Sequence, residues 1–515
     1  MDAAIDAKSI PLGSAVEGEE WIAGPVVLMR HLMLLIRSLS ELERGGLPTP
    51  PEDAYSRRDG QVVAPVFPTD AWDKLLYRGF SGEIWMDPGV TLEGLSATQA
   101  TFYREPPNEG KVAVVLGAGN VASIGPMDAL HKLFFEGQVV ALKMNPVNAY
   151  LGPFMVEALQ ALHDGGFFRV VYGGAAEGEY VCTHESVDEI HITGSDKTHD
   201  AIVYGTGPEG AERKAKRRPR NAKPISSELG NVSGMIVVPG PWSPSDLDFQ
   251  GLNLATSLTN NAGFNCNATR VIVQHREWTQ RENLLESIER GLAESPQREP
   301  YYPGAFDRHA AFLKAHPEAV QVGQTGEGKL PWTLIPGLDP DQVDDICFTT
   351  EAFCGVTSET TISAGSVVEY IDRAVDFVND SLWGTLNAGI IVHPKSMRDP
   401  AVADAVERAV ANLRVGAVGV NHWPAFAYAI VSTTWGAFPG HETHDIRSGR
   451  GTVHNTYFFG RPQKSVVRGP FRVWPKPAWF CNHKTSHRLG PKITAFTRRP
   501  SVGKLAGLFV DAIRG

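Results

Sequence analysis

The chain has 515 residues, 42% of them hydrophobic, and a formal net charge of −10. This length and composition are typical of a folded protein of about three domains, and the negative charge argues against general nucleic-acid binding. The five cysteines, Cys182, Cys266, Cys347, Cys354 and Cys481, have no paired spacing. This argues against a disulfide framework or a metal centre and is consistent with a reducing compartment. Because the first residues lack the features of a secretory signal, we expect a cytoplasmic protein.

The first part of the chain predicts a helix followed by alternating strands and helices. Residues 20–45 have apolar side chains at helical spacing. Their most apolar stretch, 26–36, contains Arg30 and His31 and is too short and too polar to span a bilayer. Buried strands are predicted at 112–116, 139–142, 168–172 and 189–192, with helices at about 127–136 and 151–163. This alternation predicts a parallel sheet covered by helices.

Polar and small residues follow these predicted strands. Asn120, Lys143, Gly194 and Ser195 each lie at or just beyond the end of a strand. Ligands of parallel, helix-covered sheets bind beyond the carboxyl ends of the strands. The sequence therefore predicts a ligand site at this edge of the sheet.

A second α/β region, about 228–439, contains the candidate nucleophile. Cys266 lies among small and amide residues, directly before the β-branched run 271–273. Such neighbours admit a substrate and can stabilise negative charge beside the sulfur; a buried structural cysteine is the alternative interpretation. Glu228 ends a polar turn before the apolar run 235–238, so burial can raise its pKa and make it a base. A surface glutamate is the alternative.

These residues belong to an ordered set of short motifs. The set consists of Asn120, Lys143, Ile-Thr-Gly-Ser at 192–195, Glu-Leu-Gly at 228–230, Cys266 with Arg270, and Glu351-Ala352-Phe353. In order and approximate spacing, roughly residues 100–450 resemble the aldehyde dehydrogenase superfamily. The resemblance implies an α/β fold with a Rossmann-like cofactor domain, an α/β catalytic domain and a β-hairpin that joins subunits. By position, the cofactor domain is residues 1–84 and 111–228, the catalytic domain is residues 229–450 and the hairpin is residues 85–110. A C-terminal extension, 451–515, follows, and its strand pairs with the hairpin.

The resemblance also implies a catalytic role for three residues. Cys266 would attack the aldehyde carbon as a thiolate, because cysteine ionises readily and its thioester can be hydrolysed. The side-chain amide of Asn120 and the backbone N–H of Cys266 would hold the oxyanion. Glu228 would activate the water that releases the acid.

Five further residues would bind NAD or NADP. By the same resemblance, Lys143 binds the adenosine ribose, and Gly194 and Ser195 meet the pyrophosphate near a helix start. Glu351 binds the ribose hydroxyls of the nicotinamide half, and Phe353 lies behind the ring.

Two departures from the family pattern concern the cofactor. Pro146 stands where many NAD-preferring members carry an acid, so the choice between NAD and NADP stays open. His199 stands where a glycine is usual.

The leading hypothesis is oxidation of an aldehyde to the acid with NAD(P). Phe264, Trp423 and Phe426 would give an apolar approach if they face the tunnel, which favours an aliphatic or aromatic aldehyde; core packing is the alternative. A coenzyme A-acylating dehydrogenase or thioester reductase is the closest rival, and Glu228 argues against it because transfer to a thiol needs no water-activating base. A non-catalytic cofactor-binding subunit is the third reading, disfavoured by the joint presence of Cys266, Asn120 and Glu228.

The C-terminal tail differs in charge from the rest of the chain. Residues 461–515 contain twelve Lys or Arg and one acid, Asp511. An apolar helical segment beside these cations is suited to subunit packing, which we favour, or to contact with an anionic membrane. The resemblance implies a homodimer or homotetramer.

Overall fold

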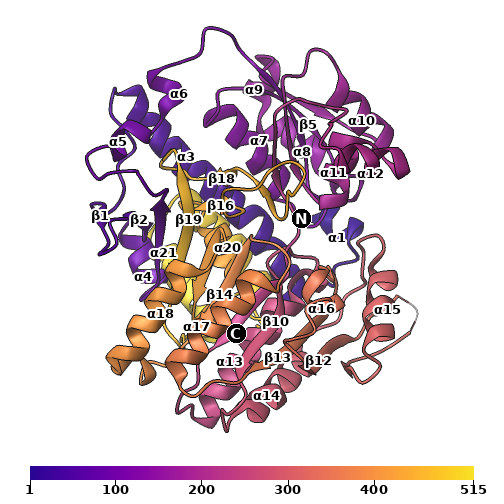
Figure 1. Cartoon of the computed structure of the whole chain (residues 1–515). Helices are drawn as coiled ribbons and strands as arrows, with labels where there is room; N and C mark the ends of the chain where they lie inside the picture. The colour runs from indigo at the N-terminus through magenta and orange to yellow at the C-terminus, as the bar shows by residue number, and fades with distance from the viewer. Residues whose placement is uncertain (327) are drawn as a thin grey trace.

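Two large sheets organise the chain in the computed structural model, which describes residues 1–326 and 328–515. One sheet has six strands and the other eleven, and helices cover both (Figure 1). A further pair of strands, β16 (Thr434–Gly436) and β18 (Thr452–His454), is antiparallel. The predicted α/β class with parallel sheets is confirmed.

The six-stranded sheet forms from the first α/β region. Its order is β17-β8-β7-β4-β5-β6, and only the short edge strand β17 is antiparallel to its neighbour. The strands are β4 (Val112–Leu116), β5 (Val139–Lys143), β6 (Phe168–Val171), β7 (Glu189–Thr193), β8 (Ile225–Glu228) and β17 (Gly449–Arg450). The connecting helices are α7 (Ile124–Phe134), η2 (Pro146–Leu151), α8 (Gly152–Ala158), α9 (Gln160–Asp164), α10 (Ala175–Thr183), α11 (Asp196–Tyr204) and α12 (Gly207–Ala215). All four predicted strands are present: β4, β5 and β7 are apolar runs in the interior of the sheet, and β6 is its partly exposed edge strand.

The eleven-stranded sheet is parallel at its centre. Its order is β1-β2-β3-β19-β15-β14-β9-β10-β13-β12-β11, with parallel pairing from β19 to β12 and antiparallel pairing at both edges. The strands are β1 (Tyr55–Ser56), β2 (Val62–Phe67), β3 (Ser81–Met86), β9 (Ser233–Val237), β10 (Thr269–His275), β11 (Val320–Val322), β12 (Trp332–Leu338), β13 (Val356–Ile362), β14 (Asn387–Ile391), β15 (Ala417–Val420) and β19 (Pro462–Arg468).

Helices cover both faces of this sheet. Those of the second α/β region are α13 (Pro244–Thr259), η3 (Asn260–Gly263), α14 (Arg281–Glu294), α15 (Ala305–Ala315), α16 (Ile346–Thr349), α17 (Val367–Asp380), η4 (Ser396–Arg398), α18 (Pro400–Asn412) and α19 (Ala425–Ile430). Tyr370 of α17 and Val406 of α18 belong to one buried cluster, and Leu254 of α13 and Leu285 of α14 belong to another. The sheet is thus a rigid middle layer, and β9 and β10 at its centre follow the loops that carry the candidate base and nucleophile.

The hairpin strands lie earlier in the chain than predicted. β2 pairs with β3, and β3 pairs with β19 after residue 450, but residues 85–110 contain only the end of β3 and the short helices α5 (Leu95–Thr98) and α6 (Thr101–Arg104). The predicted range for the hairpin, 85–110, is therefore too late in the chain. Pro88, Gly89 and Gly94 interrupt the segment, whereas the β-branched and aromatic residues that favour strands lie in 62–67 and 81–86. A short helix, α4 (Ala71–Leu76), connects the two strands.

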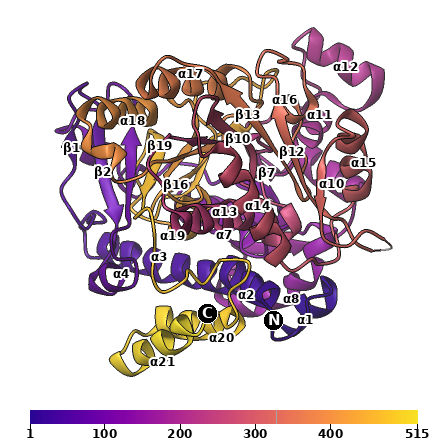
Figure 2. The same cartoon turned by 90° about the horizontal axis from the view of Figure 1, so that it is seen from below.

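Both ends of the chain are helical and lie together. The N-terminal elements are α1 (Asp2–Ala7), α2 (Ala15–Trp21), η1 (Ile22–Val26) and α3 (Val27–Glu43), and the C-terminal ones are α20 (Ser486–Arg498) and α21 (Val502–Ile513). Helical structure is continuous from Ala15 to Glu43, longer than the apolar stretch suggested and, by length and composition alone, sufficient to cross a membrane. α20 packs on this N-terminal helix, and α21 packs on α20 (Figure 2).

Lys464 of β19 fixes this strand to the helix layer. Its buried Nζ donates hydrogen bonds to the carbonyls of Val410 (3.1 Å), Ala411 (2.9 Å) and Leu413 (2.6 Å) at the end of α18.

Lys464→Met keeps the apolar stem but leaves these carbonyls without a donor, so we expect the free energy of unfolding to fall by about 1–3 kcal/mol. Denaturant unfolding beside the exposed control Lys395→Met tests this, and equal midpoints would contradict it.

Candidate active site

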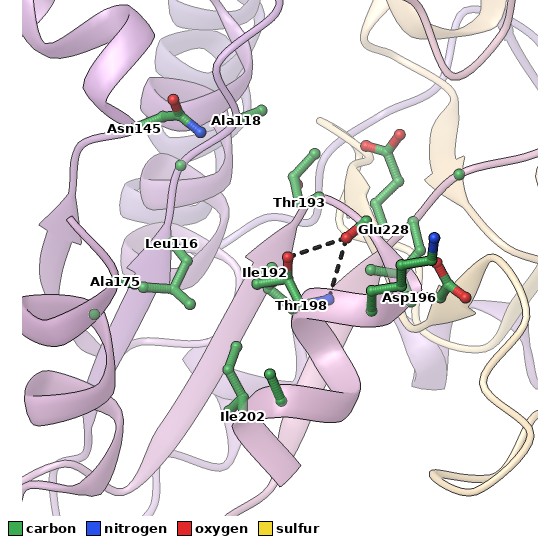
Figure 3. A pocket seen from close by; sticks show the side chains of 18 of the residues that line it. Leu116, Ala118, Asn145, Ala175, Ile192, Thr193, Asp196, Thr198, Ile202 and Glu228 are labelled. Atoms are coloured by element: carbon green, nitrogen blue, oxygen red, sulfur yellow. Dashed lines mark hydrogen bonds between the residues drawn. The ribbon is translucent and has the colours of Figure 1, made fainter. Parts of the chain in front are cut away.

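A cavity of about 840 Å³ lies between the two sheets. The carboxyl ends of four strands of the smaller sheet contribute Leu116, Lys143, Thr193 and Glu228, and a loop of the larger sheet contributes Cys266. Figure 3 labels Leu116, Thr193 and Glu228 in this cavity. All eight residues predicted for catalysis or cofactor binding line this one cavity: Asn120, Lys143, Gly194, Ser195, Glu228, Cys266, Glu351 and Phe353. Their individual roles stay predictions, but the structure brings the whole set together.

The nucleophile loop is a tight bend between α13 and β10. Asn261, Ala262 and Gly263 have φ of 55°, 56° and 78°, in the left-handed region. A side chain at Gly263 would place its Cβ 2.5 Å from the carbonyl of Cys354, so only glycine fits this close approach. The bend ends α13 and presents Cys266 at the cavity wall directly before β10.

A buried arginine holds this bend in place. Arg270 donates hydrogen bonds to the carbonyls of Gly263 (2.6 Å) and Cys354 (2.6 Å). Because the first belongs to the nucleophile loop and the second follows Phe353, one guanidinium ties the two segments together. The planar, multi-donor guanidinium group is suited to this bridging.

Cys266 and Glu228 are in direct contact. Sγ of Cys266 donates a hydrogen bond of 2.9 Å to Oε1 of Glu228. Burial raises the pKa of Glu228 to about 7, and burial and the neighbouring carboxylate raise the pKa of the Cys266 thiol well above its usual value. The pair therefore consists of a protonated thiol beside a carboxylate that can accept a proton near neutral pH.

Asn120 lies against the nucleophile loop. Its Nδ2 donates a hydrogen bond of 2.8 Å to the carbonyl of Phe264, two residues before Cys266, and the residue is buried at the cavity wall. The Asn120 amide and the Cys266 thiol thus line one cavity, and an amide of this kind can stabilise negative charge that forms on a carbonyl oxygen.

A second layer of polar residues, which the sequence analysis did not identify, supports Asn120. The hydroxyl of Tyr301 lies 2.8 Å from the carbonyl of Asn120 and 2.8 Å from Oδ1 of Asn261, and these two acceptors share its single proton. The carboxylate of Glu19, from α2, accepts the backbone N–H of Asn261 at 3.0 Å. These contacts span up to 242 residues of sequence, so no local motif could have indicated them.

The cofactor-side residues line the other part of the cavity. Lys143 ends β5 and is largely buried, which lowers the pKa of its ammonium group. Ser195 caps α11 by accepting the Thr198 N–H at 3.1 Å, and residues 193–198 line the cavity at this helix start. Unpaired N–H groups and the dipole of a helix start favour an anion. His199, at the position where glycine is usual, is fully buried in α11 and does not obstruct the opening.

Glu351 and Phe353 follow α16 and meet the catalytic loop from the opposite side. Oε1 of Glu351 accepts the backbone N–H of Asn231 at 3.2 Å, and burial raises the pKa of Glu351 to about 7. A Cβ at Gly230 would clash with this carboxylate. Phe353 has φ of 41° and its ring lies 5.1 Å from that of Tyr302, so this strained residue is held by packing.

The three aromatics proposed to form an apolar approach do not line the cavity. Phe264 is fully buried against Tyr301 and Phe353. Phe426 belongs to a core cluster, and Trp423 donates to the carbonyl of Asn267. Phe264 and Phe426 are buried behind the site, where large apolar rings are favoured, whereas Trp423 is half-buried and held by its hydrogen bond.

The other cysteines near the site are packing residues. Cys347 and Cys354 are 4% and 0% exposed and belong to the main core cluster. Burial raises the pKa of the Cys354 thiol to about 11. A buried thiol of this kind is inert, so Cys266 is the cysteine that this geometry offers as a nucleophile.

Comparisons with known proteins place these observations in a family. Residues 80–315 match the aldehyde dehydrogenase family model. The chain is 30% identical over 285 residues to 4-trimethylaminobutyraldehyde dehydrogenase of Mus musculus, covering 50% of each chain. It is 26% identical over 199 residues to NADP-dependent glyceraldehyde-3-phosphate dehydrogenase of Streptococcus equinus, covering 36% of this chain and 38% of that one. The matches thus span half or less of the length of these relatives.

Solved structures share the fold over most of the chain. NADP-dependent glyceraldehyde-3-phosphate dehydrogenase from Bacillus halodurans, complexed with NADP, has a TM-score of 0.55 and 15% identity, covering 90% of this chain and 88% of that one. AldH of Staphylococcus aureus, in a substrate-bound state, has a TM-score of 0.55 and 14% identity, covering 89% and 84%. Residues 80–315 therefore carry an aldehyde dehydrogenase family domain, and the fold of these solved structures extends over about 90% of the chain.

Proposed function

We propose that the protein oxidises an aldehyde to the carboxylic acid with NAD or NADP as the hydride acceptor. The observation that carries this proposal is the 2.9 Å contact between the Cys266 thiol and the Glu228 carboxylate. This pair lies in one cavity with Asn120, Lys143 and Glu351. A nucleophile, a base and a nucleotide-sized cavity at the strand ends are the parts that such a reaction needs.

The first step joins the substrate to the thiol. The thiol proton moves to Glu228 as the sulfur bonds to the aldehyde carbon, and the carbonyl π electrons become an oxyanion. The Asn120 amide and the Cys266 backbone N–H donate hydrogen bonds to this oxyanion. The product of the step is a thiohemiacetal on Cys266.

The cavity fits a dinucleotide by its own residues. The start of α11 suits the pyrophosphate, Lys143 suits a ribose hydroxyl, and Glu351 suits the ribose of the nicotinamide half, with Phe353 behind it. When bound, NAD(P) would supply the hydride acceptor, so that the carbon attached to the Cys266 sulfur would be left as a thioester. The residue three positions after Lys143 is Pro146, which lines the cavity and has no carboxylate. This leaves either cofactor acceptable, because nothing there repels a 2′-phosphate.

The last step releases the acid. Once Glu228 has returned its proton to solvent, its carboxylate takes a proton from water, and the resulting hydroxide attacks the thioester carbon. The carbon–sulfur bond breaks, the acid leaves and Cys266 is free again. A buried carboxylate whose pKa is about 7 suits this role.

The proposed substrate is an apolar aldehyde, aliphatic or aromatic. Cys266 packs against a cluster that includes Phe67 and Trp435, with Tyr428 beside it. The same cluster contains Phe426, one of the three aromatics predicted from the sequence, and an apolar surface beside the sulfur supports an apolar substrate chain. We further propose a cytoplasmic homodimer or homotetramer; the five unpaired cysteines support a reducing compartment.

Two other functions would also use this cavity. A coenzyme A-acylating enzyme would form the same thioester but transfer it to a thiol; the contact of Glu228 with Cys266 supports water instead. A non-catalytic cofactor-binding subunit would not need that contact at all.

Purified protein should reduce NAD or NADP when given a medium-length or aromatic aldehyde, and the product should be the acid with or without coenzyme A. Cys266→Ala should abolish the reaction, because no other cysteine lining the cavity contacts a base. The control Cys347→Ala should retain activity. Full activity of Cys266→Ala would contradict the nucleophile, and an acyl thioester product would identify the acylating alternative.

Glu228→Gln should give a burst of cofactor reduction and then a steady-state rate about a hundredfold or more below normal. In the unchanged enzyme, the steady-state rate should rise with pH through about 7, because Glu228 is protonated below its raised pKa and ionised above it. Stopped-flow absorbance across pH measures both phases, with the exposed Glu299→Gln as control. A steady rate unchanged in Glu228→Gln would remove Glu228 from this role.

Asn120→Ala should slow the burst of cofactor reduction by about a hundredfold or more, because one oxyanion donor is lost. Tyr301→Phe, which removes the hydroxyl that positions Asn120, should give a smaller loss in kcat with little change in KM. Single-turnover rates measure both effects. If Asn120→Ala reacts at the normal rate, the oxyanion site lies elsewhere.

A further inference from the structure

The C-terminal helix α21 has apolar side chains beyond the side that packs on α20. Leu505 and Leu508 belong to or pack against the cluster shared with α20. Beside this packed side, Val502, Phe509 and Ile513 lie at helical spacing and are 74%, 36% and 58% exposed. A surface helix usually has its apolar residues on the side that packs, whereas α21 also exposes this second apolar strip. α21 is not in the core, because it lies at the periphery of the molecule below α20 (Figure 2).

The surroundings of this exposed face are strongly basic. Residues 486–515 contain six Lys or Arg, all exposed, and one acid. That acid, Asp511, is buried and bonded to Lys492, so it presents no negative charge at the surface. Within these residues the exposed charge is therefore entirely positive.

A groove between the two terminal helical regions reaches the first turn of α21 at Lys504. It has a volume of about 520 Å³, and its walls combine the apolar Trp21, Met29 and Pro491 with the cationic Arg498 and Arg499. An apolar floor beside two guanidinium groups is complementary to an amphiphile with a negatively charged head.

We propose that α21, with the adjoining cations of α20, docks on the surface of an anionic lipid bilayer. Val502, Phe509 and Ile513 enter the boundary between headgroups and acyl chains, and Arg498 and Arg499 contact lipid phosphates. Apolar burial and attraction to anionic lipid are the two terms that hold such helices at an interface. The surface is less suited to a second copy of the chain, because a two-fold contact would bring these uncompensated cations together. This inference is independent of the proposed oxidation.

Co-sedimentation of the full-length protein with vesicles tests the proposal. We expect binding to phosphatidylcholine vesicles containing phosphatidylglycerol to exceed binding to pure phosphatidylcholine by at least about tenfold at low salt, and to weaken as salt is added. Phe509→Asp with Ile513→Asp should lower the affinity by about tenfold or more. The matched control, Phe154→Asp with Phe306→Asp, changes exposed phenylalanines on other elements and should bind normally.

A second variant separates charge from apolar contact. Arg498→Gln with Arg499→Gln should lower binding to anionic vesicles by about tenfold without changing molecular mass in light scattering. Equal binding to neutral and anionic vesicles, or normal binding by either double variant, would overturn the proposal. A smaller oligomer on Phe509→Asp with Ile513→Asp would also overturn it and assign the face to a second copy of the chain.

Discussion

The contact between the Cys266 thiol and the Glu228 carboxylate is the interaction on which the account of this molecule depends. Glu228 ends a strand of the smaller sheet and Cys266 lies just before a strand of the larger sheet, so the pair exists only because the two sheets meet at the cavity. Burial changes both partners: it keeps the thiol protonated and raises the pKa of the carboxylate to about 7. A base and a nucleophile matched in this way are suited to chemistry at neutral pH.

The surrounding structure restrains this pair more than its local sequence suggests. The left-handed bend at Asn261 is held by Glu19 from the N-terminal helix and by Tyr301, while Arg270 joins the bend to the segment after Phe353. The N-terminal helical layer is therefore part of the support of the active site. A substitution at Glu19, far from the reacting atoms, can act through the position of the nucleophile loop.

Much of the fold and the site could be predicted from the sequence, for identifiable reasons. Apolar runs such as 112–116 are sufficient to indicate buried parallel strands, and residues at strand ends, such as Lys143, converge because of that topology. The predicted hairpin range, 85–110, is too late in the chain. Pro88, Gly89 and Gly94 interrupt that range, whereas the β-branched and aromatic residues that form strands lie at 62–67 and 81–86. The support by Glu19 and Tyr301, and the burial of Phe264, depend on contacts between distant segments, which no spacing reveals.

The central claim is that Cys266 carries the acyl group and Glu228 removes it with water. Its most direct test is the intact mass of Glu228→Gln after mixing with an aldehyde and NAD or NADP, followed by peptide mapping. We expect one added acyl group, located on the peptide that contains Cys266 and released by an added thiol. Cofactor reduction with no covalent adduct, or an adduct on another residue, would contradict it.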